Sequence, residues 1–200
     1  CYSKTVNFFY QQKDIPVQSC VLLDEKEKAL NCSKGDLKLY FCENCGLIFN
    51  GLFVPDTQKL NENYETSQAF SSCFNSFAKS LADQMVENYG LYGKDIVEIG
   101  CGRGEFLDLI CKTGKNRGIG IDPAYHSNGF DFKSDVSFLT ESYSEKHKNL
   151  PCDFICCRHT LEHISECGRF IKTISANIDQ KNIPVFIEIP DSQRILREGA

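Results

Sequence analysis

Hydrophobic and polar positions follow different patterns in three parts of the chain. From residue 91 to about residue 190, short apolar runs alternate with amphipathic stretches, which predicts a mostly parallel sheet with helices on both faces. The predicted strands are Asp95–Ile99, Arg117–Ile121, Val136–Leu139, Asp153–Cys157 and Pro184–Ile189. The predicted helices are Glu105–Thr113, which stops at Gly114, and a later one marked by Phe170, Ile171, Ile174 and Ile178.

Residues 61–90 are expected to be mainly helical, because apolar side chains recur there at spacings of three and four. The stripe consists of Phe70, Cys73, Phe74, Phe77, Leu81, Met85, Val86 and Tyr89. Thr66 or Ser67 could cap the start of this helix, and Gly90 fits its end. A stripe of this kind is typical of a helix that packs on a core, and we expect this one to connect a small module to the domain that follows.

Residues 1–60 contain short strand-like pieces separated by polar turns. Val21–Leu23 and Leu37–Phe41 are such pieces, and the charged run Asp24–Lys28 between them is typical of a solvated face. A continuous pattern of core residues is missing, which indicates a module that needs a stabilising cross-link. The expected organisation is therefore a module at 1–60, a connecting helix at 61–90 and an α/β domain at 91–200.

Composition narrows the class of protein. The 200 residues include 22 Lys and Arg against 27 Asp and Glu, a net charge of −5, so the basic surface of a nucleic-acid binder is not expected. Apolar runs stay well short of the roughly 18 residues that a membrane span needs. Twelve cysteines without a signal segment favour a reducing cytoplasm. Because both ends look cut, we expect a piece of a longer protein that lacks its C-terminal part.

The strongest motif is the glycine-rich segment Gly100-Cys101-Gly102-Arg103-Gly104 between a predicted strand and a predicted helix. Glycines there allow close approach of the backbone to a ligand. The spacing is Gly-x-Gly-x-Gly, which differs from the Gly-x-Gly-x-x-Gly of dinucleotide dehydrogenases. Asp122 ends the next strand 18 residues after Gly104, near the distance at which a carboxylate reaches a ribose hydroxyl. Taken singly, each part could be only a tight turn or a helix cap.

The stretch from Glu98 to Gly104 followed by Asp122 resembles the class I S-adenosylmethionine-dependent methyltransferases. The resemblance implies a three-layer Rossmann-like sandwich and a cofactor site. In that site the glycine turn lines the methionine moiety, Asp122 binds the ribose, and Glu98 lies near the methionine amino group. An acidic residue after the third strand lies beside the adenine, and the segment after the fourth strand contacts the cofactor again. The implied residues are Glu98, Gly100, Cys101, Gly102, Gly104, Asp122, Glu141, Ser142, Cys157 and Arg158.

Three further segments occur in order: Ile15–Ser19, Cys42-x-x-Cys45-Gly46 with the residues up to Asn50, and Cys157–Ile164. With them the sequence looks like the methyltransferases that carry an N-terminal zinc-binding domain, a group that includes sugar C-methyltransferases. A Cys-x-x-Cys-Gly knuckle can direct two thiolates onto one Zn²⁺. By resemblance Cys1 is a third ligand beside Cys42 and Cys45, and a fourth lies upstream. Cys20 and Cys32 are substitutes, and a redox dithiol or plain burial are the alternatives.

The segment His159-Thr160-Leu161-Glu162-His163 has the His-x-x-Glu-His pattern of an inverted zinc protease, but here it follows a buried strand in a methyltransferase-like order. Some methyltransferases hold a divalent cation with Glu-x-x-Glu-His at this place, where this sequence has His159 instead of the first Glu. We expect His159 to be the catalytic base, because it lies just beyond the carboxyl end of the fourth strand. Tyr64 is the second candidate. His126 and His147 are expected at the surface.

The sequence supports three function classes. The first is a methyltransferase that uses S-adenosylmethionine and a small-molecule acceptor, with C-methylation of a sugar or related metabolite as one possibility, and with a structural zinc ion. The second is another nucleotide-binding α/β enzyme, such as a dehydrogenase, against which the glycine spacing counts. The third is a catalytically silent scaffold of the methyltransferase type that binds a partner. Nucleic acid and membrane are not expected as partners, and the oligomeric state stays open.

Overall fold

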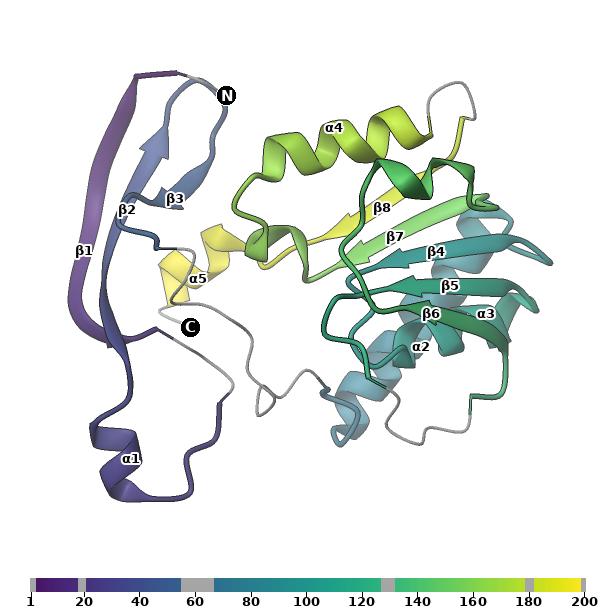
Figure 1. Ribbon diagram of the computed structural model, residues 1–200, viewed down its shortest axis with the longest axis horizontal. Helices are drawn as coiled ribbons and strands as arrows, with labels where there is room; N and C mark the ends of the chain where they lie inside the picture. The colour runs from purple at the N-terminus through teal and green to yellow at the C-terminus, as the bar shows by residue number, and fades with distance from the viewer. Residues whose placement is uncertain (1–2, 18–20, 55–66, 127–131, 179–181, 199–200) are drawn as a thin grey trace. The chain divides into compact units, whose positions relative to one another are not determined.

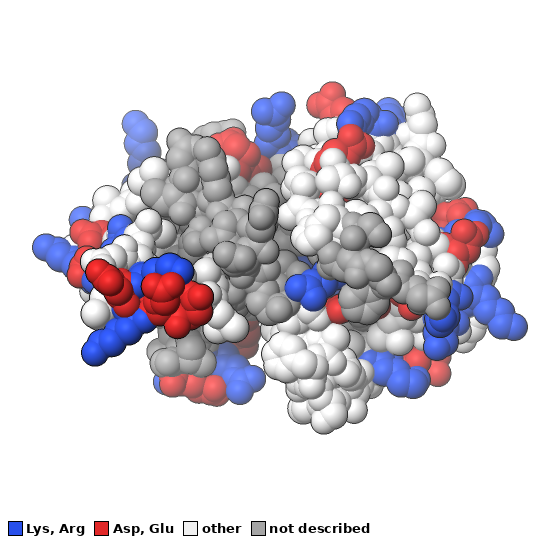
Figure 2. All heavy atoms as spheres, turned by 60° about the horizontal axis from the view of Figure 1, so that its bottom comes forward, with Lys and Arg blue, Asp and Glu red and all other residues white. Residues whose placement is uncertain are grey.

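The computed structural model describes residues 3–17, 21–54, 67–126, 132–178 and 182–198. The chain divides into two compact units, one formed by residues 1–65 with 191–200 and the other by residues 66–190. In the described ranges, every helix is too short or too polar to cross a membrane. On the face drawn in Figure 2, acidic and basic side chains of the described residues are intermixed, without a patch of basic charge alone.

A five-stranded parallel sheet forms the centre of the unit at 66–190 (Figure 1). Its strands are β4 (Asp95–Ile99), β5 (Arg117–Ile121), β6 (Asp135–Leu139), β7 (Phe154–Arg158) and β8 (Val185–Glu188), in the order β6-β5-β4-β7-β8. The central strands β4 and β7 are apolar almost throughout, as expected for parallel strands covered on both faces. The predicted bounds of β4 and β5 are confirmed, and those of the other three strands differ by one residue at one or both ends.

Helices cover both faces of this sheet (Figure 1). The core on one face contains residues of α2 (Ser72–Tyr89) and α3 (Glu105–Gly114), and the core on the other contains residues of α4 (Cys167–Asn177). The 3₁₀ helix η2 (Glu145–Asn149) precedes β7, and a second one, η3 (Leu161–His163), follows it. The first core is formed by Ala82, Met85, Val86, Leu91, Ile96, Leu107, Ile110, Cys111, Phe154 and Cys156. Val97, Ile99, Ile121, Ile155, Cys157 and Ile174 form the second.

The long helix α2 begins later than predicted. Its N-cap is Ser71, whose side chain accepts the N–H of Phe74, whereas Thr66 lies outside the described residues and Ser67 makes a different contact. Gly90 ends the helix in the left-handed conformation, as expected. The apolar stripe is buried only in part. The buried residues of the helix are Ala78, Ala82, Met85 and Val86, while the predicted stripe members Phe70, Phe77 and Tyr89 are exposed.

The unit at 1–65 with 191–200 contains a three-stranded antiparallel sheet. Its strands are β1 (Val6–Pro16), β2 (Lys34–Cys42) and β3 (Ile48–Asn50), and its helices are α1 (Lys26–Leu30) and α5 (Ser192–Glu198). Leu37–Phe41 is confirmed as part of a strand. Val21–Leu23 forms no strand of this sheet, and Leu22 is 88% exposed. Much of the charged run Asp24–Lys28 lies at the start of α1, where its side chains are solvated as predicted.

Candidate functional site

The order of the strands singles out one edge of the parallel sheet. β5 lies on one side of β4 and β7 on the other, so the chain reverses its direction of winding at β4. In open α/β sheets, ligands bind at the carboxyl ends of the strands beside such a reversal. Four loops reach this edge, with Gly100–Gly104 after β4, Asp122 after β5, Glu141 after β6 and His159 after β7.

The glycine loop is fixed by the strand beside it. Gly100 has a φ of +72°, and a Cβ added there would collide with the side-chain oxygen of Thr160, so only glycine fits. The N–H of Gly102 donates to Asp122 Oδ2 at 2.9 Å, and the N–H of Ala124 donates to Asp122 Oδ1 at 2.8 Å. One carboxylate therefore holds the loop after β4 against the end of β5. Asp122 and the glycine turn, predicted separately from the sequence, are in direct contact.

Glu98 and Arg158 are buried together on neighbouring strands. Glu98 is 3% exposed, it accepts a hydrogen bond from the backbone N–H of Leu107, and its Oε2 has no partner among the described residues. Burial raises the pKa of this carboxyl to about 8, although the nearby Arg158 acts in the opposite direction. Arg158 donates from Nε to Glu188 Oε2 at 2.5 Å and lies over the ring of Phe106. A buried acceptor without a partner is unusual and fits a site for a ligand donor.

His159 lies where β7 ends and has the backbone of a turn. Its φ is +47°, and its N–H donates to the carbonyl of Glu188 at 2.9 Å. The imidazole is half exposed, with Nε2 3.4 Å from Glu188 Oε1 and Nδ1 3.6 Å from Glu162 Oε1. An accessible imidazole beside two carboxylates has the geometry of a proton acceptor. Tyr64, the other predicted catalytic residue, lies outside the described residues.

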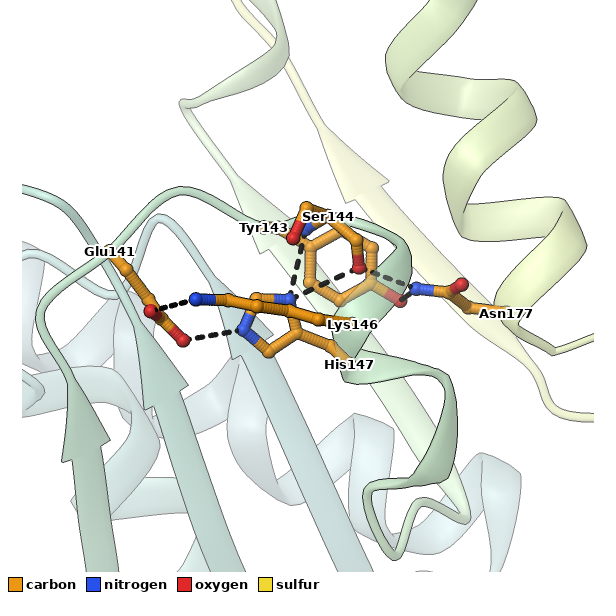
Figure 3. A network of polar contacts seen from close by, with 6 residues as sticks. All are labelled: Glu141, Tyr143, Ser144, Lys146, His147 and Asn177. Carbon is orange, nitrogen blue, oxygen red and sulfur yellow. Dashed lines mark hydrogen bonds and ion pairs between the residues drawn. The ribbon is translucent and has the colours of Figure 1, made fainter.

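Glu141 belongs to a network of polar contacts that the sequence did not indicate (Figure 3). Its two carboxylate oxygens contact Lys146 Nζ and His147 Nε2, and these contacts lower the pKa of Glu141. The prediction that His147 lies at the surface is wrong, because this side chain is 5% exposed and hydrogen bonded. Ser142, by contrast, is exposed.

Two predicted cysteines of this edge are buried. Cys157 packs in the core on the α4 side, where burial raises the pKa of its thiol to about 11. Burial also raises the pKa of Cys101 in the glycine loop. Both side chains are therefore neutral packing groups. Any contact of Cys157 with a ligand at the sheet edge has to come from its backbone.

The knuckle at Cys42 and Cys45 follows β2. Cys42 is buried and Cys45 is exposed, and Gly46 has the positive φ of a tight turn. The pKa of the Cys42 thiol is lowered, chiefly because the backbone N–H of Cys45 donates a hydrogen bond to its sulfur. The backbone N–H of Asn44 donates to the same sulfur and lowers the pKa further. Thiolate character of this kind suits a metal ligand. In the part of the chain that the structure describes, however, no three His, Cys, Asp or Glu side chains are grouped to hold a metal ion, and Cys1 lies outside that part.

Two residues of this region were missed by sequence reasoning. Glu188 contacts both Arg158 and His159, and it ends an apolar strand just as Asp122 does, so the same signal could have identified it. Ser67 is buried and donates its hydroxyl hydrogen to the carboxylate of Glu105, the first residue of α3. No local pattern could have found that contact, because it joins residues far apart in the chain.

The sheet order, the helices on both faces and the glycine loop define a Rossmann-like α/β domain with its ligand edge at the ends of β4, β5, β6 and β7. The family model described as "Methyltransferase domain" matches residues 73–199, more than half of the chain. The chain therefore belongs to the methyltransferase-domain family. Among curated proteins, no sequence match was found.

Two solved structures illustrate the likeness. The plantazolicin methyltransferase BpumL, in complex with a triazolic desmethylPZN analog and SAH, is 20% identical, with 72% of this chain and 56% of that chain covered at a TM-score of 0.51. A SAM-dependent methyltransferase from Archaeoglobus fulgidus is 25% identical, with 63% of this chain and 60% of that chain covered at a TM-score of 0.40. The BpumL structure supports the fold. This chain spans 52% of another BpumL structure, in complex with SAH, and 62% of a putative methyltransferase from Methanococcus maripaludis.

Proposed function

We propose that this chain binds S-adenosylmethionine at the carboxyl edge of its parallel sheet and transfers the methyl group to a small-molecule acceptor. The observation that carries the proposal is the contact between Asp122 and Gly102, which organises a Gly-x-Gly-x-Gly turn beside a strand-end carboxylate in a member of the methyltransferase-domain family. Each Asp122 oxygen uses one lone pair for the backbone and can accept another hydrogen bond. Two ribose hydroxyls are suitable donors.

The residues present fit the cofactor's chemistry. Glu98 Oε2 is a buried acceptor without a partner among the described residues, which suits the positively charged amino group of a methionine moiety. The glycine turn leaves room for a ligand to approach the backbone closely. When bound, S-adenosylmethionine supplies a methyl group that is already activated by its sulfonium. The task left to the protein is to align the acceptor and, where needed, to remove a proton.

We assign the removal of that proton to His159. Its imidazole is accessible at the end of β7, and Glu188 and Glu162 flank its two nitrogens, so the ring is held where it can take a proton from an acceptor carbon or hydroxyl. Tyr64 remains a second candidate for this role. The acceptor is proposed to be a small molecule, with C-methylation of a sugar or related metabolite as the narrower proposal, which rests on the sequence resemblance alone.

We further propose a structural zinc ion in the antiparallel unit, held by Cys42, Cys45 and Cys1. The lowered pKa of Cys42 and the backbone N–H groups that donate to its sulfur support this proposal, because a thiolate is the form that binds Zn²⁺. The exposed Cys45 thiol lies three residues further along the chain, across one tight turn. The ion's role would be to hold the module together.

Calorimetric titration with S-adenosylhomocysteine and with NAD tests the cofactor proposal. The wild-type chain should bind S-adenosylhomocysteine and not NAD. Asp122→Asn, which keeps the shape but removes the charge, should weaken binding by about tenfold or more, as expected for hydrogen bonds to a charged acceptor. Asp83→Asn is the matched control, because Asp83 is on α2 and pairs with Lys79. Binding of NAD instead, or equal binding by both variants, would contradict the proposal.

A further inference from the structure

Glu141 is anchored to helix α4 through a continuous set of side-chain contacts (Figure 3). Asn177, which is buried at the end of α4, donates from Nδ2 to the carbonyl of Ser144 at 2.9 Å and to the hydroxyl oxygen of Tyr143 at 3.0 Å. The ring of Tyr143 stacks on that of His147 with their centroids 5.2 Å apart. The start of η2 is thereby held against the α4 face of the sheet.

His147 is the link between this anchor and Glu141. Its Nε2 lies 2.9 Å from Glu141 Oε1, and its Nδ1 faces the Ser144 backbone, 2.9 Å from the nitrogen and 3.1 Å from the oxygen. An ionised carboxylate can only accept, so the proton must be on Nε2. In the neutral ring Nδ1 then accepts the N–H of Ser144, which is the reciprocal half of a capping box. The imidazole thus caps the helix with one nitrogen and holds Glu141 with the other.

The held carboxylate is open on its remaining side. Glu141 is 33% exposed, and each of its oxygens has a lone pair left after the contacts with His147 and Lys146. It lies at the end of β6, next to the end of β5, where Asp122 donates its N–H to the carbonyl of Leu139. The group beside the proposed ribose site is therefore a fixed acceptor with no hydrogen to donate.

We propose that His147 is a positioning residue, which fixes Glu141 as the acceptor for the 6-amino group of the cofactor's adenine and so makes the site prefer adenine to hypoxanthine. This inference rests on the proposed function above. Hypoxanthine carries a carbonyl oxygen at the same place, which an acceptor repels. Lys146 also contacts Glu141, but its side chain is largely exposed.

The two nitrogens of His147 can be tested separately in the full chain. Asparagine places its amide where Nδ1 is, so His147→Asn keeps the cap on η2 and loses the contact with Glu141. Glutamine reaches the position of Nε2, so His147→Gln keeps a donor for Glu141. The probes are S-adenosylhomocysteine and S-inosylhomocysteine, which differ at position 6 of the base. Glu145→Gln, a substitution at an exposed position of the same 3₁₀ helix, is the matched control.

Calorimetry should show that the wild type, Glu145→Gln and His147→Gln prefer S-adenosylhomocysteine by about tenfold, since a charged acceptor contributes that much to discrimination. His147→Asn should lose most of this preference while its melting temperature stays near the wild-type value. In a Glu141→Gln background, His147→Asn should have no further effect. A full preference retained in His147→Asn, or additive losses in the double variant, would overturn the inference alone. Failure of the wild type to bind either probe would overturn the cofactor proposal together with it.

Discussion

The two units of this chain are built on opposite principles. The parallel sheet is covered by helices on both faces, and its side chains fill two cores. In the antiparallel unit, Cys42 is the only buried hydrophobic residue among those described, and Phe8, Phe9 and Tyr10 of β1 remain 42–50% exposed. Its β1–β2 ladder and its surface aromatic pairs, such as Tyr40 on Phe49, replace a core. The parallel unit can therefore be stable through the packing of its own two cores, whereas the antiparallel unit needs another source of stability.

The sharpest test of this comparison removes one phenyl ring from each sheet. Phe154→Ala in β7 should reduce the free energy of unfolding of the parallel unit by about 4 kcal/mol, because the ring is fully buried and leaves a cavity. Phe8→Ala in β1 should cost the antiparallel unit less than about 1 kcal/mol, since its ring is 50% exposed. Hydrogen exchange in increasing urea, read separately for peptides of each unit, measures both. Equal losses would remove the distinction between the units.

A second test uses the buried carboxyl of the parallel unit. The folded chain keeps the proton of Glu98 up to about pH 8, whereas the unfolded chain releases it near its ordinary value of 4.5. Between these values the unfolded state binds fewer protons, so the free energy of unfolding falls as pH rises, by about 1.4 kcal/mol per pH unit. Between about pH 5.5 and about pH 7.5 this amounts to roughly 3 kcal/mol.

Glu98→Gln should abolish that fall, which urea titrations of both proteins at the two pH values would reveal. If the slope with pH is the same in the variant, another group is responsible. Because the same carboxylate is proposed to meet the cofactor's amino group, the variant should also bind S-adenosylhomocysteine more weakly. Replacing this one side chain would then both stabilise the fold at about pH 7.5 and weaken binding of S-adenosylhomocysteine.

The antiparallel unit should respond to metal, and the parallel unit should not. Added Zn²⁺ in about hundredfold excess over Kd should stabilise residues 3–54 by about 2.7 kcal/mol, and a chelator should reverse the effect. Elemental analysis and limited proteolysis provide the measurement. Cys42→Ser should lose the response, whereas Cys73→Ser, an exposed thiol on α2, should retain it. A response that survives in Cys42→Ser would mean that zinc acts elsewhere.

Sequence patterns identified the parallel unit far better than the antiparallel one. The bounds of β4 and β5 follow from short, mostly apolar runs that stop at a glycine or a charged residue, which is a local signal. β1 runs on through Gln11, Gln12, Lys13 and Asp14, whose polar side chains hide the strand because both of its faces are exposed. The first turn of α2 was misplaced, because the hydroxyl of Ser67 is used by Glu105 on another helix.

At the candidate site, the sequence indicated the backbone better than the side-chain partners. The glycine turn and Asp122 could be found because spacing along the chain determines them. His147 was expected at the surface because it lies in a polar stretch, yet its ring is buried and stacks on Tyr143, whose hydroxyl Asn177 holds. The pairing of Glu188 with Arg158 and His159 depends on two strands that become neighbours only in the folded sheet. Such partners follow from tertiary structure, which a local pattern does not contain.

The position of β4 in the middle of the sheet also governs when the glycine loop can mature during synthesis. One flank of β4 is completed by β5, which follows it after a single helix, but the other flank needs β7, which emerges from the ribosome only after α3, β5, β6 and η2. Thr160, which closes over Gly100, comes later still. Pairings between distant parts of a chain form slowly. A nascent chain stalled before residue 154 would therefore expose the apolar flank of β4 to chaperones, with its ligand loop made but unsupported.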